Sequence, residues 1–203
     1  MNSINITDMM EMKEEMKQHI DWADKVLWDG LFAADVETAE AHYDIAIDIC
    51  KDLVRINFDL YKPYLAKIYV KAAIAYTLYK RNQNYQPQYQ KAEPLFLNAV
   101  EVLQGLIEQE GDNNYIELAR VYKLLGNTYV KLKERKRAKF YLKKSKKMYT
   151  ILLKKDRRYK LDITHIYEYL TQNTSWMNFM LKIFYYSVYV FRLFKPSHKI
   201  GVD

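Results

Sequence analysis

The stretch that decides the fold is residues 115–155, which read YIELARVYKLLGNTYVKLKERKRAKFYLKKSKKMYTILLKK. Its side chains follow a fixed order of size: aromatic, large, small, aromatic, then small, large, small. The residues in that order are Tyr122, Leu125, Gly126, Tyr129, Ala138, Leu142 and Ser145. Small residues at fixed offsets let two helix backbones approach closely, and large residues beside them fill the grooves. The stretch therefore predicts two packed helices, joined by a turn near residues 133–135.

The same order recurs earlier in the chain. Its first half is repeated by Tyr69, Ala72, Ala73 and Tyr76, and its second half by Ala92, Phe96 and Ala99 and again by Ala39, Tyr43 and Ala46. Self-similarity at regular intervals is typical of a repeat architecture, in which each unit is one supersecondary element. Glycine (5) and proline (4) are scarce, which favours long helices with short connections.

We treat residues 1–203 as one domain and divide it at the predicted turns. The divisions are a first repeat at 8–56, a second at 61–110 with a polar loop at 81–90, a third at 115–155, a degenerate terminal repeat at 158–194, and a tail at 195–203. Pro63 is predicted in the first turn of the helix that opens the second repeat, where its missing N–H costs nothing. Residues 61–80 and 90–110 are the expected helices of that repeat.

The recurring pattern resembles the tetratricopeptide repeat, most clearly over residues 36–155. The spacings are longer than the usual period of about 34 residues, since Ala39 and Ala92 lie 53 positions apart and Ala92 and Ala138 lie 46 apart. The longer period is similar to that of kinesin light chains and of bacterial signalling scaffolds. The resemblance implies an all-α, right-handed α-solenoid of three to four helix-turn-helix repeats. It also implies a non-catalytic scaffold that binds a protein or peptide.

In this family the first helices of the repeats line a concave groove. The resemblance assigns groove positions to Lys67, Lys71, Arg120, Lys123, Asn127 and Lys131. Chaperone-binding members hold a peptide's terminal carboxylate with a lysine and an asparagine, and Lys123 and Asn127 match that pair. Lys67 and Lys71 resemble a second basic pair, although here it comes first. The resemblance therefore implies an acidic peptide as partner, and solvated lysines on a polar groove remain the alternative.

Charge is unevenly distributed along the chain. Residues 1–60 contain 5 Lys/Arg and 14 Asp/Glu, whereas residues 131–160 contain 15 Lys/Arg and 2 Asp/Glu. The basic patch in the second of these segments comprises Arg135, Lys136, Arg137, Lys139, Lys143, Lys144 and Lys147. Such clustered charge is enough to bind phosphate groups. Nucleic-acid or anionic-surface binding through residues 131–160 is therefore the alternative function, with a solvated helix face or an acidic protein as other readings.

Residues 176–194 are apolar on every side of a predicted helix. The aromatic residues assigned there to an interface are Trp176, Phe179, Phe184, Tyr185 and Phe191. A helix of this kind has to be buried all round, which predicts a homodimer or docking on a partner. Lys182 and Arg192 interrupt the apolar run, so a membrane span, which needs about 20 apolar residues, is a less favoured reading.

Nothing in the sequence indicates catalysis. The histidines, His19, His42, His165 and His198, are predicted to lie far apart, and no phosphate-binding loop or nucleophile motif is found. Cys50 is the single cysteine, which predicts a buried thiol and no thiolate metal site. We therefore expect no enzyme activity, no cofactor and no metal. The residues from Met1 to Asp8 do not resemble a secretory signal, which favours a cytoplasmic protein.

Overall fold

The computed structural model describes residues 6–29, 33–77, 87–110 and 114–171. Its helices are α1 (Ile6–Asp29), α2 (Ala33–Ile56), α3 (Phe58–Thr77), α4 (Tyr89–Glu110), α5 (Tyr115–Lys131), α6 (Arg135–Lys155) and α7 (Lys160–Thr171), with a short 3-10 helix (Arg157–Tyr159) before α7. These residues contain no strand. The all-α prediction is confirmed.

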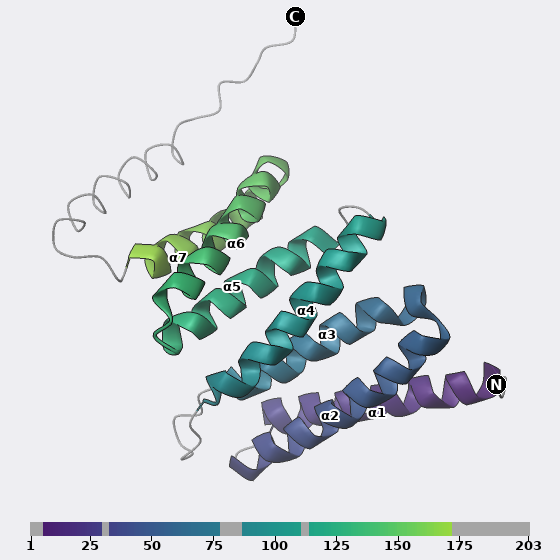
Figure 1. The fold of residues 1–203 in the computed structure, drawn as a ribbon. Coiled ribbons are helices and arrows are strands. Elements are labelled where there is room, and N and C mark those ends of the chain that lie inside the picture. The colour runs from purple at the N-terminus through teal and green to yellow at the C-terminus, as the bar shows by residue number, and fades with distance from the viewer. Residues whose placement is uncertain (1–5, 30–32, 78–86, 111–113, 172–203) are drawn as a thin grey trace, which may run out of the picture.

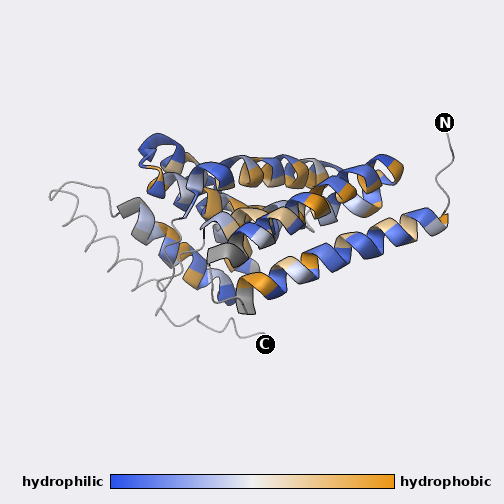
Figure 2. Ribbon diagram, turned by 90° about the horizontal axis from the view of Figure 1, so that it is seen from below, coloured by the Kyte–Doolittle hydropathy of each residue, from blue (hydrophilic) through white to orange (hydrophobic). Residues whose placement is uncertain are grey.

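Each helix packs mainly against the helices next to it in the chain. As a result α1 and α2 lie at one end of the molecule and α6 and α7 at the other (Figure 1). Among helices that are not consecutive, α5 and α7 also touch. Hydrophilic and hydrophobic residues alternate along the helices (Figure 2), as expected when each helix buries one side.

The residues of the recurring pattern form the seams between helices. All the aromatic and aliphatic members are buried, from Ala39 and Tyr43 in α2 to Ala138 and Leu142 in α6. Ser145 is also fully buried, and its hydroxyl donates to the Ala119 carbonyl oxygen at 2.8 Å, so the polar atom is satisfied. The prediction that these residues face the neighbouring helix is confirmed.

Gly126 lies at a close contact between α5 and α6. A Cβ added there would be 2.6 Å from Leu142 Cγ and 3.2 Å from the Leu142 backbone nitrogen. The spacing pattern predicts Ala138 opposite this glycine. That partner is wrong, because Leu142, one turn further along α6, fills the space instead.

The turn between α5 and α6 lies at residues 132–134, within one residue of the predicted position, and α6 begins at Arg135. Lys133 has φ of 61°, in the left-handed region. Its N–H donates to Val130 O at 3.1 Å, and the Glu134 N–H donates to Tyr129 O at 2.9 Å. These two bonds satisfy carbonyl groups at the end of α5, which is the Schellman arrangement.

The predicted place of Pro63, in the first turn of a helix, is wrong. α3 begins at Phe58, so Pro63 lies inside the helix and beyond its first turn. Asn57 is the only residue between α2 and α3, and its side-chain oxygen accepts the Leu60 N–H at 3.2 Å. This capping bond starts the helix five residues before Pro63. Pro94 occupies the equivalent position of α4, five residues after its start at Tyr89, and is likewise inside the helix.

A three-residue cluster occurs twice between neighbouring helix pairs. In the first, Glu40 of α2 accepts from Tyr76 of α3 and lies 3.9 Å from Lys91 Nζ of α4. Lys91 Nζ also sits 5.2 Å from the centre of the Tyr76 ring. Burial is the main reason that the pKa of Tyr76 rises, to about 12, with the charge of Glu40 adding to the effect.

The second cluster, one helix pair further along, has an arginine in place of the lysine. Glu93 of α4 accepts from Tyr129 of α5 at 2.8 Å and from Arg137 of α6 at 3.0 Å. The Arg137 guanidinium lies 5.3 Å from the Tyr129 ring centre. In both clusters an acid, a tyrosine and a cation come from three consecutive helices, so the same contacts join α2 to α4 and α4 to α6.

Candidate binding groove

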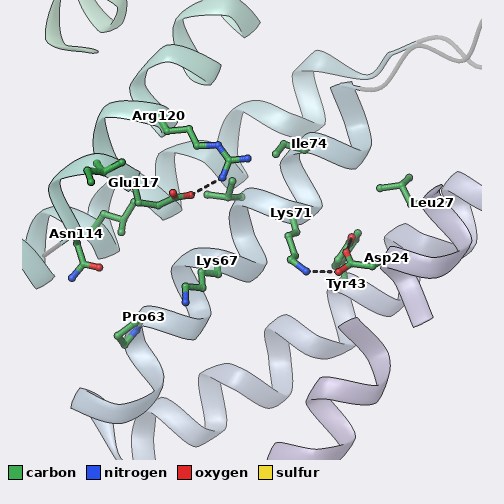
Figure 3. Close-up of a pocket in the computed structure, with 13 residues that line it drawn as sticks. Asp24, Leu27, Tyr43, Pro63, Lys67, Lys71, Ile74, Asn114, Glu117 and Arg120 are labelled. Carbon is green, nitrogen blue, oxygen red and sulfur yellow. Dashed lines mark hydrogen bonds and ion pairs between the residues drawn. The ribbon is translucent and has the colours of Figure 1, made fainter. Parts of the chain in front are cut away.

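A cavity of about 630 Å³ opens between α1, α3 and α5, with α2 and α4 behind it. Its lining consists of Asp24, Leu27, Tyr43, Pro63, Lys67, Val70, Lys71, Ile74, Leu103, Asn114, Ile116, Glu117 and Arg120. Figure 3 shows Lys67 and Lys71 on α3, Glu117 and Arg120 on α5, and Asp24 and Tyr43 reaching toward Lys71 from α1 and α2. The lining combines apolar side chains with three cations and two carboxylates, so a ligand could meet both apolar and charged groups there.

Two of the three cations in the groove already have a carboxylate partner. Lys71 of α3 forms an ion pair with Asp24 of α1, and Arg120 pairs with Glu117 of its own helix at 3.3 Å (Figure 3). Asp24 also accepts a hydrogen bond from the Tyr43 hydroxyl at 2.5 Å. Burial, and then the bond to Asp24, raise the pKa of Tyr43, so this phenol stays neutral.

Lys67 is the third cation, and its side chain is exposed in the groove. Its ammonium lies 5.7 Å from the centre of the Tyr64 ring, a cation–π contact. Among the described residues, no Asp or Glu forms an ion pair with it. The formal charge of the lining is therefore +1, and Lys67 is the cation best placed to meet an anionic ligand.

The six predicted groove residues are divided by the structure. Lys67, Lys71 and Arg120 line the cavity together. Lys123, Asn127 and Lys131 lie further along α5 and are not part of its lining. Lys131 is exposed in the last turn of that helix.

Lys123 forms an ion pair with Asp162 of α7. Its side chain is only 19% exposed, and its ammonium also lies 5.8 Å from the Tyr149 ring centre. The neighbouring Asn127 has a buried side-chain oxygen that receives no hydrogen bond within the described residues. The lysine of the predicted carboxylate clamp is thus held by a carboxylate of the chain itself, and the interaction serves to attach α7.

The basic patch lies on α6, which contains ten lysines and arginines and no Asp or Glu. Arg137 pairs with Glu93 and, at 3.1 Å, with Glu134. Lys144 lies over the rings of Tyr122 and Phe140, at 5.2 Å and 4.7 Å from their centres. The other predicted members, Arg135, Lys136, Lys139, Lys143 and Lys147, are exposed and have no carboxylate partner among the described residues.

Two histidines that were expected to lie apart are in contact. His19 Nδ1 of α1 and His42 Nδ1 of α2 are 2.6 Å apart, and the Trp22 ring lies 4.3 Å from the His42 ring. Burial and the proximity of His19 lower the pKa of His42. Sequence reasoning missed this pair because the two residues are 23 positions apart, and only the α1–α2 packing brings them together.

The structure also bears on the predictions made for the cysteine, for metal sites, for membrane spans and for the C-terminal aromatic residues. Cys50 is buried, as predicted, and burial raises the pKa of its thiol to about 12, which makes the thiol unreactive. In the described part of the chain, no three His, Cys, Asp or Glu residues are close enough to hold a metal ion. No described helix is long and apolar enough to cross a membrane. The predicted interface residues Trp176, Phe179, Phe184, Tyr185 and Phe191 lie outside the described residues.

No model of a known protein family matches this chain, and no curated protein matches it in sequence.

Proposed function

We propose that this chain is a non-catalytic scaffold that binds a short acidic peptide in the groove between α1, α3 and α5. Its helix pairs are the units of a right-handed, tetratricopeptide-like solenoid. The observation that carries the proposal is the cavity of about 630 Å³, in which Lys67, Lys71 and Arg120 stand beside an apolar lining.

The repeated contacts support a repeat architecture. The seam residues recur at the same offsets, and the Glu–Tyr–cation cluster occurs in two successive interfaces. Because α1, α3 and α5 occupy equivalent positions in successive pairs, they present one continuous surface. A peptide laid across them contacts three helices, which explains how a groove without catalytic groups still acquires specificity.

Charge defines the ligand. A carboxylate of the peptide forms a charge-assisted bond with Lys67 and competes with Glu117 for Arg120. Apolar side chains of the peptide contact Ile74 and Ile116, which line the cavity and are not fully buried. Lys71 contributes less, because it stays paired with Asp24.

Fluorescence anisotropy with a panel of labelled acidic peptides tests the proposal. Lys67→Glu and Arg120→Glu should each weaken binding about tenfold or more, since a hydrogen bond to a charged group contributes about 1.5–3 kcal/mol. Lys131→Glu is the matched control, because it makes the same charge change on α5 outside the cavity lining.

A variant expected to bind acidic peptides more tightly complements the variants expected to bind them more weakly. Glu117→Gln removes the carboxylate that neutralises Arg120, so acidic peptides should bind it more tightly than the unmodified chain. Peptide binding that responds equally to Lys67→Glu and Lys131→Glu would show that net charge, not the groove, determines affinity, and the proposal would then be wrong.

A further inference from the structure

The outer side of α6 carries a straight stripe of lysines and apolar residues. Its members are Lys136, Phe140, Lys143, Lys147, Ile151 and Lys154, and all of them are exposed. Their spacings of three and four residues place them on one face of the helix. From Lys136 to Lys154 the stripe is about 27 Å long, at about 1.5 Å per residue.

No acidic side chain within the stripe offsets the positive charge of its lysines. α6 contains no acidic residue. Among the described residues, none of the four lysines of the stripe forms an ion pair. By contrast, Arg137 on another side of the same helix is held by Glu93 and Glu134. Because no carboxylate of the described residues pairs with these lysines, binding of an external anion would relieve their mutual repulsion.

The apolar members narrow the class of partner. Phe140 is 52% exposed and Ile151 is 40% exposed, although both lie among charged residues. Contacts with the backbone of a duplex use cationic and polar side chains, and they give an exposed aliphatic side chain such as Ile151 no partner. At a lipid surface, lysines meet the anionic headgroups while apolar side chains enter the boundary with the acyl chains.

The use of lysine rather than arginine in the stripe also favours an anionic lipid surface as the partner. The stripe contains lysines and no arginine, whereas recognition of individual phosphates and bases favours the bidentate guanidinium. A lysine is a point charge that suits a diffuse negative surface. In addition, residues 176–194 of the sequence contain many aromatic and aliphatic residues with only Lys182 and Arg192 as charges. Stable membrane attachment commonly combines a basic patch with a second, apolar element.

We propose that the outer stripe of α6 docks this chain on an anionic lipid membrane, parallel to the membrane surface. Lys136, Lys143, Lys147 and Lys154 contact the headgroups, and Phe140 and Ile151 enter the interface. The site is separate from the groove, and this proposal does not depend on peptide binding there.

Vesicle co-sedimentation of the full chain tests the proposal. The chain should bind vesicles of phosphatidylcholine mixed with phosphatidylserine, and should bind vesicles of phosphatidylcholine alone much less. Binding should weaken as salt is added, because the attraction is screened. Replacing three lysines of the stripe, by Lys136→Gln, Lys143→Gln and Lys147→Gln, should reduce affinity about a hundredfold, since each lysine near the surface contributes about fivefold.

The matched control replaces three exposed lysines of α1 and α2, by Lys17→Gln, Lys25→Gln and Lys51→Gln. Its net charge changes equally, and its vesicle binding should be unchanged. Phe140→Ser should reduce binding about fivefold to tenfold at constant charge, because it removes apolar area from the interface. Circular dichroism melting of each variant confirms that the fold is retained.

Three results would overturn the proposal. The first is vesicle binding that survives the triple substitution in α6, which would place the contact elsewhere. The second is loss of binding to duplex DNA or RNA on that substitution, with no binding to anionic vesicles. The third is a salt-sensitive increase in mass without vesicles that the same substitution abolishes, which would make a second copy of the chain the partner.

Discussion

The seam between α3 and α4 and the seam between α5 and α6 follow one pattern of large and small residues, yet they differ in how closely the helices meet. Each contains one glycine. A Cβ on Gly126 would be 2.6 Å from Leu142 Cγ, and behind it stands the Leu142 backbone at 3.2 Å. A Cβ on Gly105 would meet only the end of the Lys62 side chain, at 2.9 Å. The same residue type is therefore required by packing in one seam and replaceable in the other.

The largest effect is expected for Gly126→Ala. The added methyl group cannot be accommodated by a side-chain rotation alone, because Leu142 is buried and its backbone is close. Overpacking of this kind costs about 1–3 kcal/mol. Thermal unfolding followed by circular dichroism should show a lower melting temperature than that of the unmodified chain. An unchanged melting temperature would show that α5 and α6 are further apart than the structure indicates.

Tyr129→Phe should have the next largest effect. The hydroxyl of this buried tyrosine donates to Glu93, and its removal leaves Glu93 with Arg137 alone. A loss of about 1 kcal/mol in the free energy of unfolding is expected for such a bond, measured by urea denaturation. Tyr141→Phe, at a half-buried neighbour on α6 whose ring stacks on Tyr129, is the control, since it changes no bond to Glu93. If the two variants lost equal amounts of unfolding free energy, the hydrogen bond from Tyr129 to Glu93 would not be what stabilises this seam.

The seams could be predicted from the sequence because their rules are local. Offsets of three and four residues identify one face of a helix, and the small residues identify where two faces meet. The same rules gave the turn at Lys133 but placed Gly126 opposite Ala138 instead of Leu142. Which turn of the facing helix fills a gap depends on the crossing of the two helices, and spacing along one helix does not contain that information.

The groove could be predicted only in part for the same reason. The resemblance to the tetratricopeptide repeat implies groove positions for Lys67, Lys71 and Arg120, and these three do line the cavity. The carboxylate partners of these cations could not be predicted. Asp24 lies 47 residues before Lys71 and pairs with it only because α1 packs against the neighbouring helices. Asp162 likewise lies 39 residues after Lys123. One usable signal was overlooked, namely the acid that follows a small seam residue in both Ala39-Glu40 and Ala92-Glu93.

A gain of stability is expected for Gly105→Ala, in contrast to Gly126→Ala. Alanine is favoured over glycine inside a helix by about 1 kcal/mol. Part of this gain is lost, because Lys62 has to move and its ammonium lies 4.1 Å from the Phe58 ring centre. A net increase of about half a kcal/mol in the free energy of unfolding remains. Urea denaturation of the two glycine variants side by side should give changes of opposite sign. A loss at both positions would mean that the α3–α4 seam is as close as the α5–α6 seam.

The smallest effect is expected in the seam between α1 and α2, where the contact between His19 and His42 makes stability depend on pH. The pKa of His42 is lowered in the folded chain, by burial and by His19, so the unfolded chain binds protons more readily. The stability contributed by neutral His42 is therefore fully present above about pH 6.5, the ordinary imidazole pKa, and is lost as the pH falls below it. His42→Asn should flatten the dependence of melting temperature on pH between neutral and mildly acidic conditions. His165→Asn is the control, because this exposed histidine lies on α7 and outside the pair. If His165→Asn flattened the profile equally, the dependence would arise from overall charge rather than from the contact between α1 and α2.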